Sequence, residues 1–209
     1  MPDGVRDGES QRMTPPRITG IVLAAGSSRR LGTPKQVLPY RETTLLGATL
    51  DVARAAGFDQ LIVTLGGAAQ AVRDSVRMDG ADVVTVEDHA TGCSASLRVA
   101  LERVDPQVAG VVLMLGDQPH VAPATVRRMI AAGPGADIMV CSYTDGVGHP
   151  FWFSRHVFGE LSQLHGDKGV WKLVQSGRHR VHELAVDGPV PLDVDTWDDY
   201  RRLLESVTS

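Results

Sequence analysis

Apolar and polar residues follow one another along this chain in blocks that predict strands separated by helices. Short runs rich in Val, Ile and Leu, bounded by polar or glycine-containing segments, have the composition of strands buried in a parallel sheet. These predicted strands are residues 21–24, 61–65, 82–86, 110–115 and 137–141. Helical spacing of apolar residues predicts helices in the segments between them, the first ending at Gly57 and the last covering residues 123–132. This alternation predicts a parallel sheet with right-handed crossovers.

The last third of the chain is less regular. It contains a predicted strand at 151–154, a loosely alternating segment at 180–186 and a short closing strand in V-P-L-D-V-D-T, with predicted helices at 157–164, 168–175 and 197–207. Thr196 is the predicted N-cap of the final helix, with Asp199 three residues on. We expect one domain, residues 18–209, with a Rossmann-like three-layer α/β/α fold and a mostly parallel central sheet. Residues 1–17 are polar and rich in Gly and Pro, which predicts a disordered tail.

The stretch I-V-L-A-A-G-S-S-R-R-L-G-T-P-K-Q, residues 21–36, predicts a polyphosphate site. Gly26 permits a turn with positive φ, and successive N–H groups in such a turn attract anions. Arg29, Arg30 and Lys35 add cations suited to phosphate. Lys35 is followed by Gln36, which excludes a Walker A loop, and a G-x-G-x-x-G pattern is absent. The alternative interpretation is a solvated basic loop after a core strand.

Composition limits the partners. The chain has 209 residues, 43% of them hydrophobic, and a formal net charge of −4, so it has no global basic field for nucleic acid or an acidic membrane. The basic loop is therefore a local site for a small anion. No apolar run approaches the ~20 residues that span a bilayer, and the N-terminus lacks the apolar region of a secretion signal. Cys93 and Cys141 show no metal-ligand spacing, which is typical of reduced thiols in a cytoplasmic protein.

Asp117 is the first candidate metal ligand. It follows the most apolar predicted strand, 110–115, and ligands of open α/β sheets bind beyond the carboxyl ends of the strands. The loop from Gly26 to Lys35 lies at the same level, and Mg²⁺ prefers a few carboxylates together with phosphate oxygens and water. Alternatively, Asp117 only stabilises the turn before Pro119.

The signature stretch resembles the L-A-A-G-x-S-x-R-x-G-x-x-K pattern of the nucleotidyltransferases. The matching residues are Leu23, Ala24, Ala25, Gly26, Ser28, Arg30, Gly32 and Lys35, while Leu31 stands where Met is usual. The resemblance implies that Asp117, in G-D-Q-P, and Asp195, in the late D-x-D-T segment, hold Mg²⁺, with Asp193 in reserve. Complementing a helix dipole is an alternative role that fits Asp198 and Asp199 better than Asp195.

Two further blocks sharpen the resemblance. Residues 92–98 resemble the G-x-x-x-S-L-R stretch near the nucleotide base and sugar, which implies that Gly92, Ser96 and Ser27 bind nucleotide together with the signature residues. Gly148-His149-Pro150 and the later G-D-K-G resemble the G-H-P…L-x-G-D-x-G pattern of the molybdenum cofactor cytidylyltransferases (MocA/MobA-like). Gln118, His149 and Pro150 are therefore expected to bind the acceptor.

Some of these residues have structural alternatives. His149 could equally bond a loop carbonyl group. Asp167 and Lys168 are expected to cap the helix that they precede, rather than to contact a ligand. Core packing is expected for Trp152, and a partly exposed helix position for Trp171.

The resemblance implies a Mg²⁺-dependent transfer of a nucleoside monophosphate to a phosphorylated acceptor, with pyrophosphate as leaving group. Arg30, Lys35 and Asp117 are the expected catalytic residues. The forms L-A-A-G and G-D-Q-P favour CTP over GTP, and the implied acceptor is molybdopterin. Two alternatives stay open: a sister transferase with another nucleotide or acceptor, and a non-catalytic nucleotide- or cofactor-binding accessory protein for a molybdenum hydroxylase. A Rossmann oxidoreductase lacks its glycine pattern here.

Overall fold

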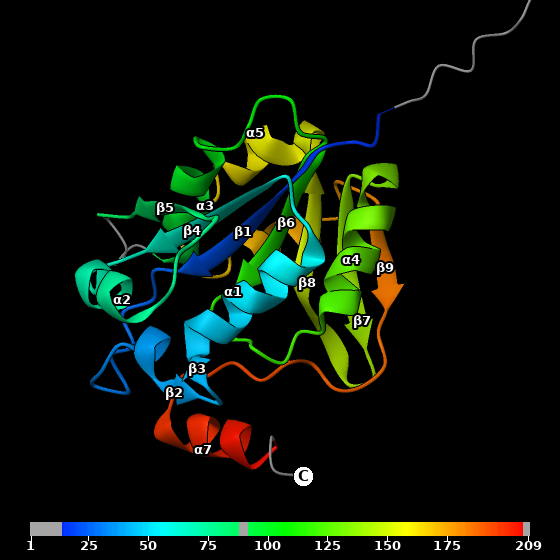
Figure 1. Ribbon diagram of the computed structural model, residues 1–209. Helices are drawn as coiled ribbons and strands as arrows, with labels where there is room; N and C mark the ends of the chain where they lie inside the picture. Colours follow the sequence, from blue (N-terminus) through cyan, green and yellow to red (C-terminus); the bar gives the residue numbers. More distant parts are fainter. Residues whose placement is uncertain (1–13, 88–91, 207–209) are drawn as a thin grey trace, which may run out of the picture.

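The computed structural model describes residues 14–87 and 92–206, which contain a seven-stranded sheet of order β5-β4-β1-β6-β8-β7-β9 (Figure 1). Within this sheet, only β8 runs antiparallel to its neighbours. The strands are β1 (Ile18–Ala24), β4 (Gln60–Leu65), β5 (Asp82–Thr85), β6 (Gly110–Leu115), β7 (Ile138–Tyr143), β8 (Gly146–Ser154) and β9 (Val181–Ala185). A separate ribbon pairs β2 (Pro39–Tyr40) with β3 (Thr43–Thr44).

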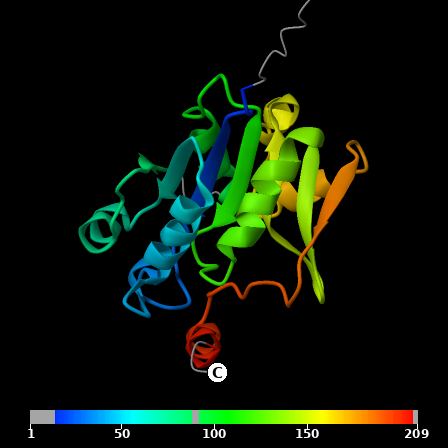
Figure 2. The same ribbon diagram turned by 45° about the vertical axis from the view of Figure 1, so that its right-hand side comes forward.

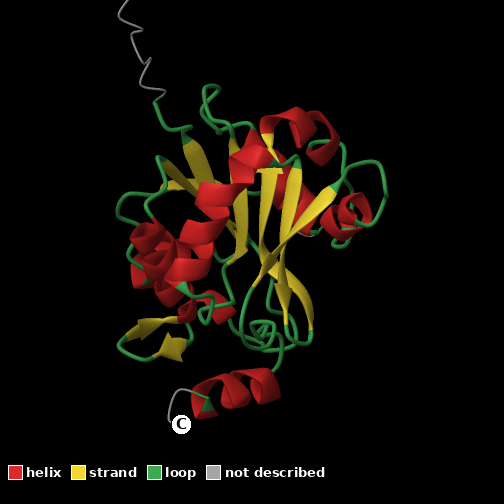
Figure 3. Ribbon diagram, turned by 90° about the vertical axis from the view of Figure 1, so that its right-hand side faces the viewer, coloured by secondary structure: helices red, strands yellow, loops and turns green. Residues whose placement is uncertain are grey.

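Helices cover both faces of the sheet (Figure 3). One face carries α1 (Leu45–Ala56), α2 (Ala69–Ser75) and α4 (Pro123–Ala132), and the other carries α3 (Cys93–Leu101), α5 (Phe158–Leu161) and α6 (Gly169–Val174). Successive strand residues face opposite ways: Val22 packs into the first layer, whereas Ile21 and Leu23 pack into the second. The predicted three-layer α/β/α fold with a mostly parallel sheet is confirmed.

A third, smaller apolar cluster lies at the carboxyl ends of the parallel strands. It joins the loop after β1 to the segment 186–196, here called the strap, and to α7 (Trp197–Glu205). The strap leaves β9 and crosses beneath the strand ends to α7 (Figure 2). The buried members of this third cluster are Leu31, Leu38, Tyr40, Leu45, Val194 and Leu203. This cluster brings the end of the chain to the edge of the sheet where the signature loop begins.

Two predictions in the last third were wrong in detail. Residues 190–196 form no strand, because Pro189 and Pro191 have no N–H to give a ladder and the N–H of Val190 donates to Asp145 Oδ1 instead (2.7 Å). The strand predicted at 151–154 is the end of β8, which begins at Gly146 and pairs with β7 as a hairpin. Its two early glycines and Pro150 hid the strand pattern.

Several local predictions are confirmed. Gly57 ends α1 in a left-handed conformation, with φ 84°. Thr196 caps α7, and Asp199 completes the capping box. Trp152 is fully buried and Trp171 is half-buried.

Residues 1–13 of the predicted tail lie outside the described residues. Its last residue, Arg17, belongs to the fold: its carbonyl group accepts from the N–H of Ala109 (2.9 Å), and its guanidinium pairs with Asp105 (2.6 Å). Within the described ranges, no helix is both long and apolar enough to cross a bilayer. The 3-10 turns are η1 (Lys35–Val37), η3 (Gly133–Gly135) and η4 (Arg155–Val157).

Candidate active site

The side chain of Lys35 joins two carboxylates that come from distant parts of the chain. Its Nζ lies 2.5 Å from Asp117 Oδ2 and 3.0 Å from Asp195 Oδ1. Arg30 approaches the other oxygen of Asp195 at 3.4 Å, with 70% of its side chain exposed. The structure therefore brings together the predicted catalytic residues Arg30, Lys35 and Asp117 and the predicted metal pair Asp117 and Asp195.

The strand pairing explains why Asp117 meets the signature loop. β1 and β6 are adjacent parallel strands, with Leu23 opposite Leu115, so their loops leave the same edge of the sheet. The N–H of Gly116 continues the pairing by donating to the carbonyl group of Leu23 (2.9 Å). A Cβ on Gly116 would lie 2.8 Å from the Cβ of Ala24, so a larger residue would push the strand ends apart.

Gln36 fixes the start of the signature loop, a role that the sequence did not predict. Its side chain is buried, and Nε2 donates to the carbonyl groups of Ala24 (2.7 Å) and Gly26 (3.0 Å). In a trans peptide the N–H points away from the C=O, so the N–H groups of Ala25 and Ser27 face away from Gln36. The only sequence signal was its position directly after Lys35.

The turn of the loop differs from the prediction. Gly26 does not adopt a positive φ; the left-handed residues are Ser28, with φ 50°, and Gly32, with φ 69°. Ser28 is held there by its own contacts, because its Oγ accepts from the N–H of Lys35 (3.0 Å) and its carbonyl group accepts from the N–H of Leu31 (3.0 Å). The loop therefore turns around Ser28, and this turn orients η1 and Lys35.

The remaining signature residues divide by burial. Leu23, Ala24 and Ala25 are buried under the loop, whereas Gly26 and Ser27 are exposed. The buried three support the loop from below, so only their backbone can contact a nucleotide. The exposed two form the part of the loop that an anion can approach.

The reserve candidate Asp193 belongs to the same cluster but contacts a different partner. Gln118 is buried, and its Nε2 donates to Asp193 Oδ1 (2.7 Å) and to the carbonyl group of Pro191 (3.3 Å). Residue 193 is exposed as a whole, but its carboxyl group reaches inward to Gln118. This desolvation, and then the charge of Asp117, raise the pKa of Asp193 to about 6. Gln118, predicted to bind the acceptor, thus ties the strap to the loop after β6.

The start of α3 also faces the cluster. Cys93 is exposed as a residue, but partial desolvation of its thiol raises the pKa, and the charges of Asp167 and Asp117 raise it further. Gly92 has φ 101°, and a Cβ there would lie 2.6 Å from Asp167 Oδ1. Ser96, predicted to bind nucleotide, is buried in α3. The rest of the loop before Gly92, residues 88–91, lies outside the described residues.

The capping prediction for Asp167 and Lys168 was wrong. Neither side chain caps α6; instead, Asp167 Oδ1 accepts from the N–H of Cys93 (3.1 Å) at the start of α3. Ser94 Oγ supports the same contact by donating to the carbonyl group of Gly166 (2.6 Å). The G-D-K-G loop therefore packs over the first turn of α3, a long-range contact that local sequence could not indicate.

His149 and Pro150 lie on β8, next to the aromatic side chains of the second helix layer. The His149 ring is buried and stacks on Phe151, with ring centroids 4.1 Å apart. Burial lowers the pKa of His149 to about 3, so the ring is uncharged near neutral pH. Its carbonyl group accepts from the hydroxyl group of Tyr143 (2.7 Å). Acceptor binding by His149 and Pro150 stays a prediction.

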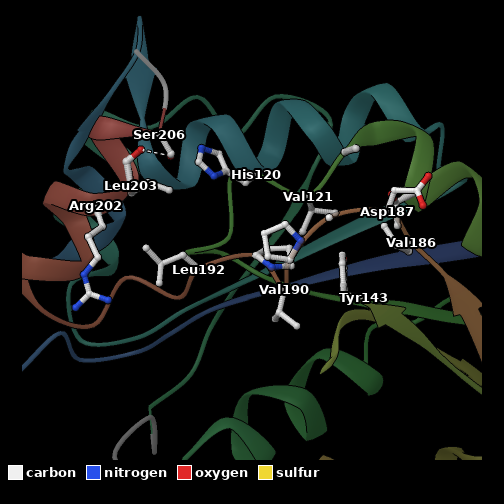
Figure 4. A pocket seen from close by; sticks show the side chains of 15 residues that line it. His120, Val121, Tyr143, Val186, Asp187, Val190, Leu192, Arg202, Leu203 and Ser206 are labelled. Carbon is white, nitrogen blue, oxygen red and sulfur yellow. Dashed lines mark hydrogen bonds between the residues drawn. The ribbon is translucent and has the colours of Figure 1, made fainter. Parts of the chain in front are cut away.

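A cleft of about 390 Å³ lies beside the strap (Figure 4). Its lining includes none of the charged cluster, which is Lys35 with Asp117, Asp193 and Asp195. His120 and Val121 from the loop before α4, Tyr143 from β7, and Val190 and Leu192 from the strap surround it. Burial, and then the charge of Arg41, lower the pKa of His120. The charged cluster and this cleft are therefore separate features of one end of the molecule.

The carboxylates fit a magnesium-type metal. Asp117 and Asp195 already direct oxygens at one cation, the ammonium of Lys35. Among the described residues, no group of three or more His, Cys, Asp and Glu side chains could hold a metal. One or two carboxylates completed by water and phosphate oxygens suit Mg²⁺ better than an all-protein site does.

Comparison with known proteins identifies the family. The model of the MobA-like NTP transferase domain matches residues 20–183. The chain belongs to this family. The MobA-like chain is thus a nucleotidyltransferase, and its family match spans the signature loop, Asp117 and His149.

The chain is also similar to solved structures and to named relatives over nearly its whole length. Rv0371c from Mycobacterium tuberculosis H37Rv is 76% identical, with TM-score 0.89 and coverage of 92% of this chain and 100% of that chain. A second Rv0371c structure, a complex with manganese, is 73% identical, with TM-score 0.84 and coverage of 91% and 99%. Nicotine blue oxidoreductase from Paenarthrobacter nicotinovorans is 28% identical (90% of this chain, 97% of that protein). Purine catabolism protein PucB from Bacillus subtilis is 26% identical (90% and 96%).

Proposed function

We propose that this MobA-like nucleotidyltransferase transfers CMP from CTP to a phosphorylated acceptor, molybdopterin, and releases pyrophosphate. The observation that carries the proposal is the ammonium of Lys35 held between Asp117 and Asp195 at the exit of β1. A cation and two carboxylates in contact at the end of a phosphate loop suit the binding of a metal and a triphosphate together. The proposed metal is Mg²⁺, and the manganese complex of Rv0371c supports a divalent ion.

The proposed reaction is an in-line displacement. A phosphate oxygen of the acceptor attacks the α-phosphorus of the triphosphate, the bond from that phosphorus to the bridging oxygen breaks, and pyrophosphate leaves with the electron pair. Two anions must meet, so the protein's task is electrostatic and positional. The acceptor phosphate is already ionised near neutral pH, and no general base is needed.

The residues divide this task. Lys35 and Arg30 neutralise the triphosphate and the charge that gathers on the leaving group, and the N–H groups of the loop from Gly26 to Ser28 hold its oxygens. A divalent metal held by Asp117 and Asp195 would supply Lewis-acid polarisation of the α-phosphate. Gly92 and Ser96, at the start of α3, are the proposed contacts for base and sugar.

The choice of substrates rests on sequence blocks and on two buried side chains. L-A-A-G and G-D-Q-P favour CTP over GTP. Gln118 lies next to Asp117, and its buried Oε1 has no hydrogen-bond partner among the described residues, which supports a role in placing the acceptor. His149 is uncharged, so it would offer the acceptor a hydrogen bond and not a charge. We place the reaction in the cytoplasm, with a molybdenum hydroxylase as the partner that receives the product.

The decisive experiment incubates the protein with Mg²⁺ and each α-labelled triphosphate, with and without molybdopterin. We expect pyrophosphate release and a labelled dinucleotide product only with CTP and molybdopterin together. Product from GTP alone among the nucleotides would move the chain to the guanylyl branch. Absence of product from every triphosphate would contradict the transferase proposal and favour a cofactor-binding accessory role.

The name of one relative supports a second candidate. Nicotine blue oxidoreductase covers nearly the whole of this chain, so an oxidoreductase activity is the alternative function. This alternative would be favoured if the protein oxidised NADH or NADPH in the presence of a quinone-type dye. The oxidation is measured as a loss of nicotinamide absorbance. The charged cluster of Lys35, Asp117 and Asp195 supports the transferase, because hydride transfer needs no such trio.

A further inference from the structure

The ammonium of Lys35 stands at the point where the two candidate metal ligands converge. Its contacts with Asp117 and Asp195 measure 2.5 Å and 3.0 Å, so it engages one oxygen of each carboxylate. The side chains of Lys35 and Asp117 are only 14% and 13% exposed, so water screens this contact weakly. An ammonium ion and a divalent metal need the same oxygen lone pairs and repel each other.

Lys35 also has somewhere else to go. The Cε of Lys35 lies near Gly26, because a Cβ built on Gly26 would be 3.9 Å from it. The stem of Lys35 therefore lies over the exposed part of the signature loop. Lys is a point charge on a flexible four-carbon stem, and a change of rotamer moves it by several ångströms. The exposed residues Gly26 and Ser27 border the region proposed for the triphosphate, which would receive the displaced ammonium.

We propose that Lys35 is a displaceable internal cation: a divalent metal takes its place between Asp117 and Asp195, and Lys35 then moves to the triphosphate. That Lys35 moves to a triphosphate rests on the proposed function, but the exchange of Lys35 for a metal does not. Lys35 keeps the carboxylates together before the metal arrives and weakens metal binding in the absence of nucleotide. Nucleotide, by attracting Lys35, makes the metal site available.

This proposal predicts that removing a catalytic lysine tightens metal binding. Mn²⁺ is titrated into the full chain without nucleotide, and the free ion is measured by electron paramagnetic resonance. Lys35→Met should bind Mn²⁺ about tenfold or more tightly than the unaltered protein. A neighbouring charge at this distance changes the binding equilibrium of an ion by a factor of about ten or more, and the variant removes the competing ammonium. Lys172→Met, which removes an exposed lysine on α6, should bind Mn²⁺ as the unaltered protein does. Equal or weaker binding by Lys35→Met would overturn the proposal.

A second measurement needs no variant, and it decides the matter if Lys35→Met does not fold. The unaltered protein is treated with an acetylating ester, and the acetylation of each lysine is followed by mass spectrometry with and without Mg²⁺. We expect Mg²⁺ to accelerate acetylation of Lys35 severalfold, because the ammonium leaves its two carboxylates, with Lys172 as the internal reference. An unchanged or slower rate at Lys35 would contradict the exchange.

Failure of this proposal can be told apart from failure of the proposed function. If the protein makes the cytidylyl product but the Lys35→Met variant binds Mn²⁺ no more tightly than the unaltered chain, the function stands and the exchange is wrong. If the protein makes no product but binds Mn²⁺ more tightly without Lys35, the exchange stands and the substrate assignment is wrong.

Discussion

The two carboxylates that contact Lys35 differ in how the chain holds them. Asp117 directly follows a core strand, its side chain is 13% exposed, and it approaches Lys35 Nζ to 2.5 Å. Asp195 lies on the strap, its side chain is 48% exposed, and it lies 3.0 Å from the same Nζ while sharing its charge with Arg30. The sheet therefore fixes one carboxylate, and the end of the chain brings the other to it.

This difference sets the strength of each contact. Burial pulls the pKa of Lys35 down, but Asp117 and then Asp195 outweigh it and raise the pKa above its ordinary value. A buried ion pair that loses one partner leaves an uncompensated charge, whereas an exposed pair is screened by water and salt. Asp117 should therefore matter more than Asp195 in every measurement.

The largest effect is expected for Asp117→Asn. The isosteric amide removes the main counter-charge of Lys35 and one proposed metal ligand, so pyrophosphate release should fall about 10³-fold or more. The matched control is Asp74→Asn, an exposed position on α2, which should release pyrophosphate at the unaltered rate. Retention of most activity by a folded Asp117→Asn protein would remove Asp117 from the mechanism.

A smaller loss is expected for Asp195→Asn. Because this carboxylate is half exposed, its removal should slow pyrophosphate release only about fivefold, since an exposed ion pair contributes up to ~1 kcal/mol. The rate difference between variant and unaltered protein should narrow as salt is raised, since exposed charges are screened. Steady-state assays over a salt series measure both effects. If Asp195→Asn is as inactive as Asp117→Asn at every salt concentration, the two carboxylates are equivalent and their unequal burial is irrelevant.

The smallest effect concerns Asp193, the third carboxylate of the cluster. Its pKa is raised from 3.8 to about 6, so the folded protein binds this proton more tightly than the unfolded chain does. The free energy of unfolding should therefore fall as pH rises from about 4 to about 6 and should not change further above that range for this reason. Because the residue is partly exposed, the change should stay under about 1 kcal/mol.

Urea unfolding curves at several pH values, for Asp193→Asn and for the unaltered protein, measure this contribution. The difference in unfolding free energy between the two proteins should shift in favour of Asp193→Asn from about pH 4 to about pH 6. A difference that shifts the opposite way, or that does not depend on pH, would show that the folded protein does not disfavour the charged form of Asp193.

The sequence predicted what depends on local pattern. Apolar periodicity located β6 and α4 at their observed bounds, and the ends of the predicted strands placed Lys35 and Asp117 at one edge of the sheet. Turn chemistry located the ends of α1 and α7, because a left-handed glycine and a capping box are local devices. These features are decided by residues a few positions apart.

Contacts between distant segments could not be predicted in the same way. Asp167 caps α3 across 74 positions, and Gln118 reaches Asp193 across 75. Gln36 turns its amide inward to two carbonyl groups of β1 and its loop, although a glutamine beside a lysine is usually a surface residue. The positive φ predicted at Gly26 is found at Ser28 instead, because hydrogen bonds to Ser28 outweigh the steric freedom of glycine.

The path of the strap also has a consequence during protein synthesis. All seven strands of the sheet are complete once β9 has been made, but Asp195 still lies ten residues further along the chain. A nascent polypeptide interrupted just after β9 would hold Lys35 against Asp117 alone. Ribosome-bound chains could thus acquire the layered architecture before Asp195 is made, and translation of the strap then adds the second proposed metal ligand to the scaffold.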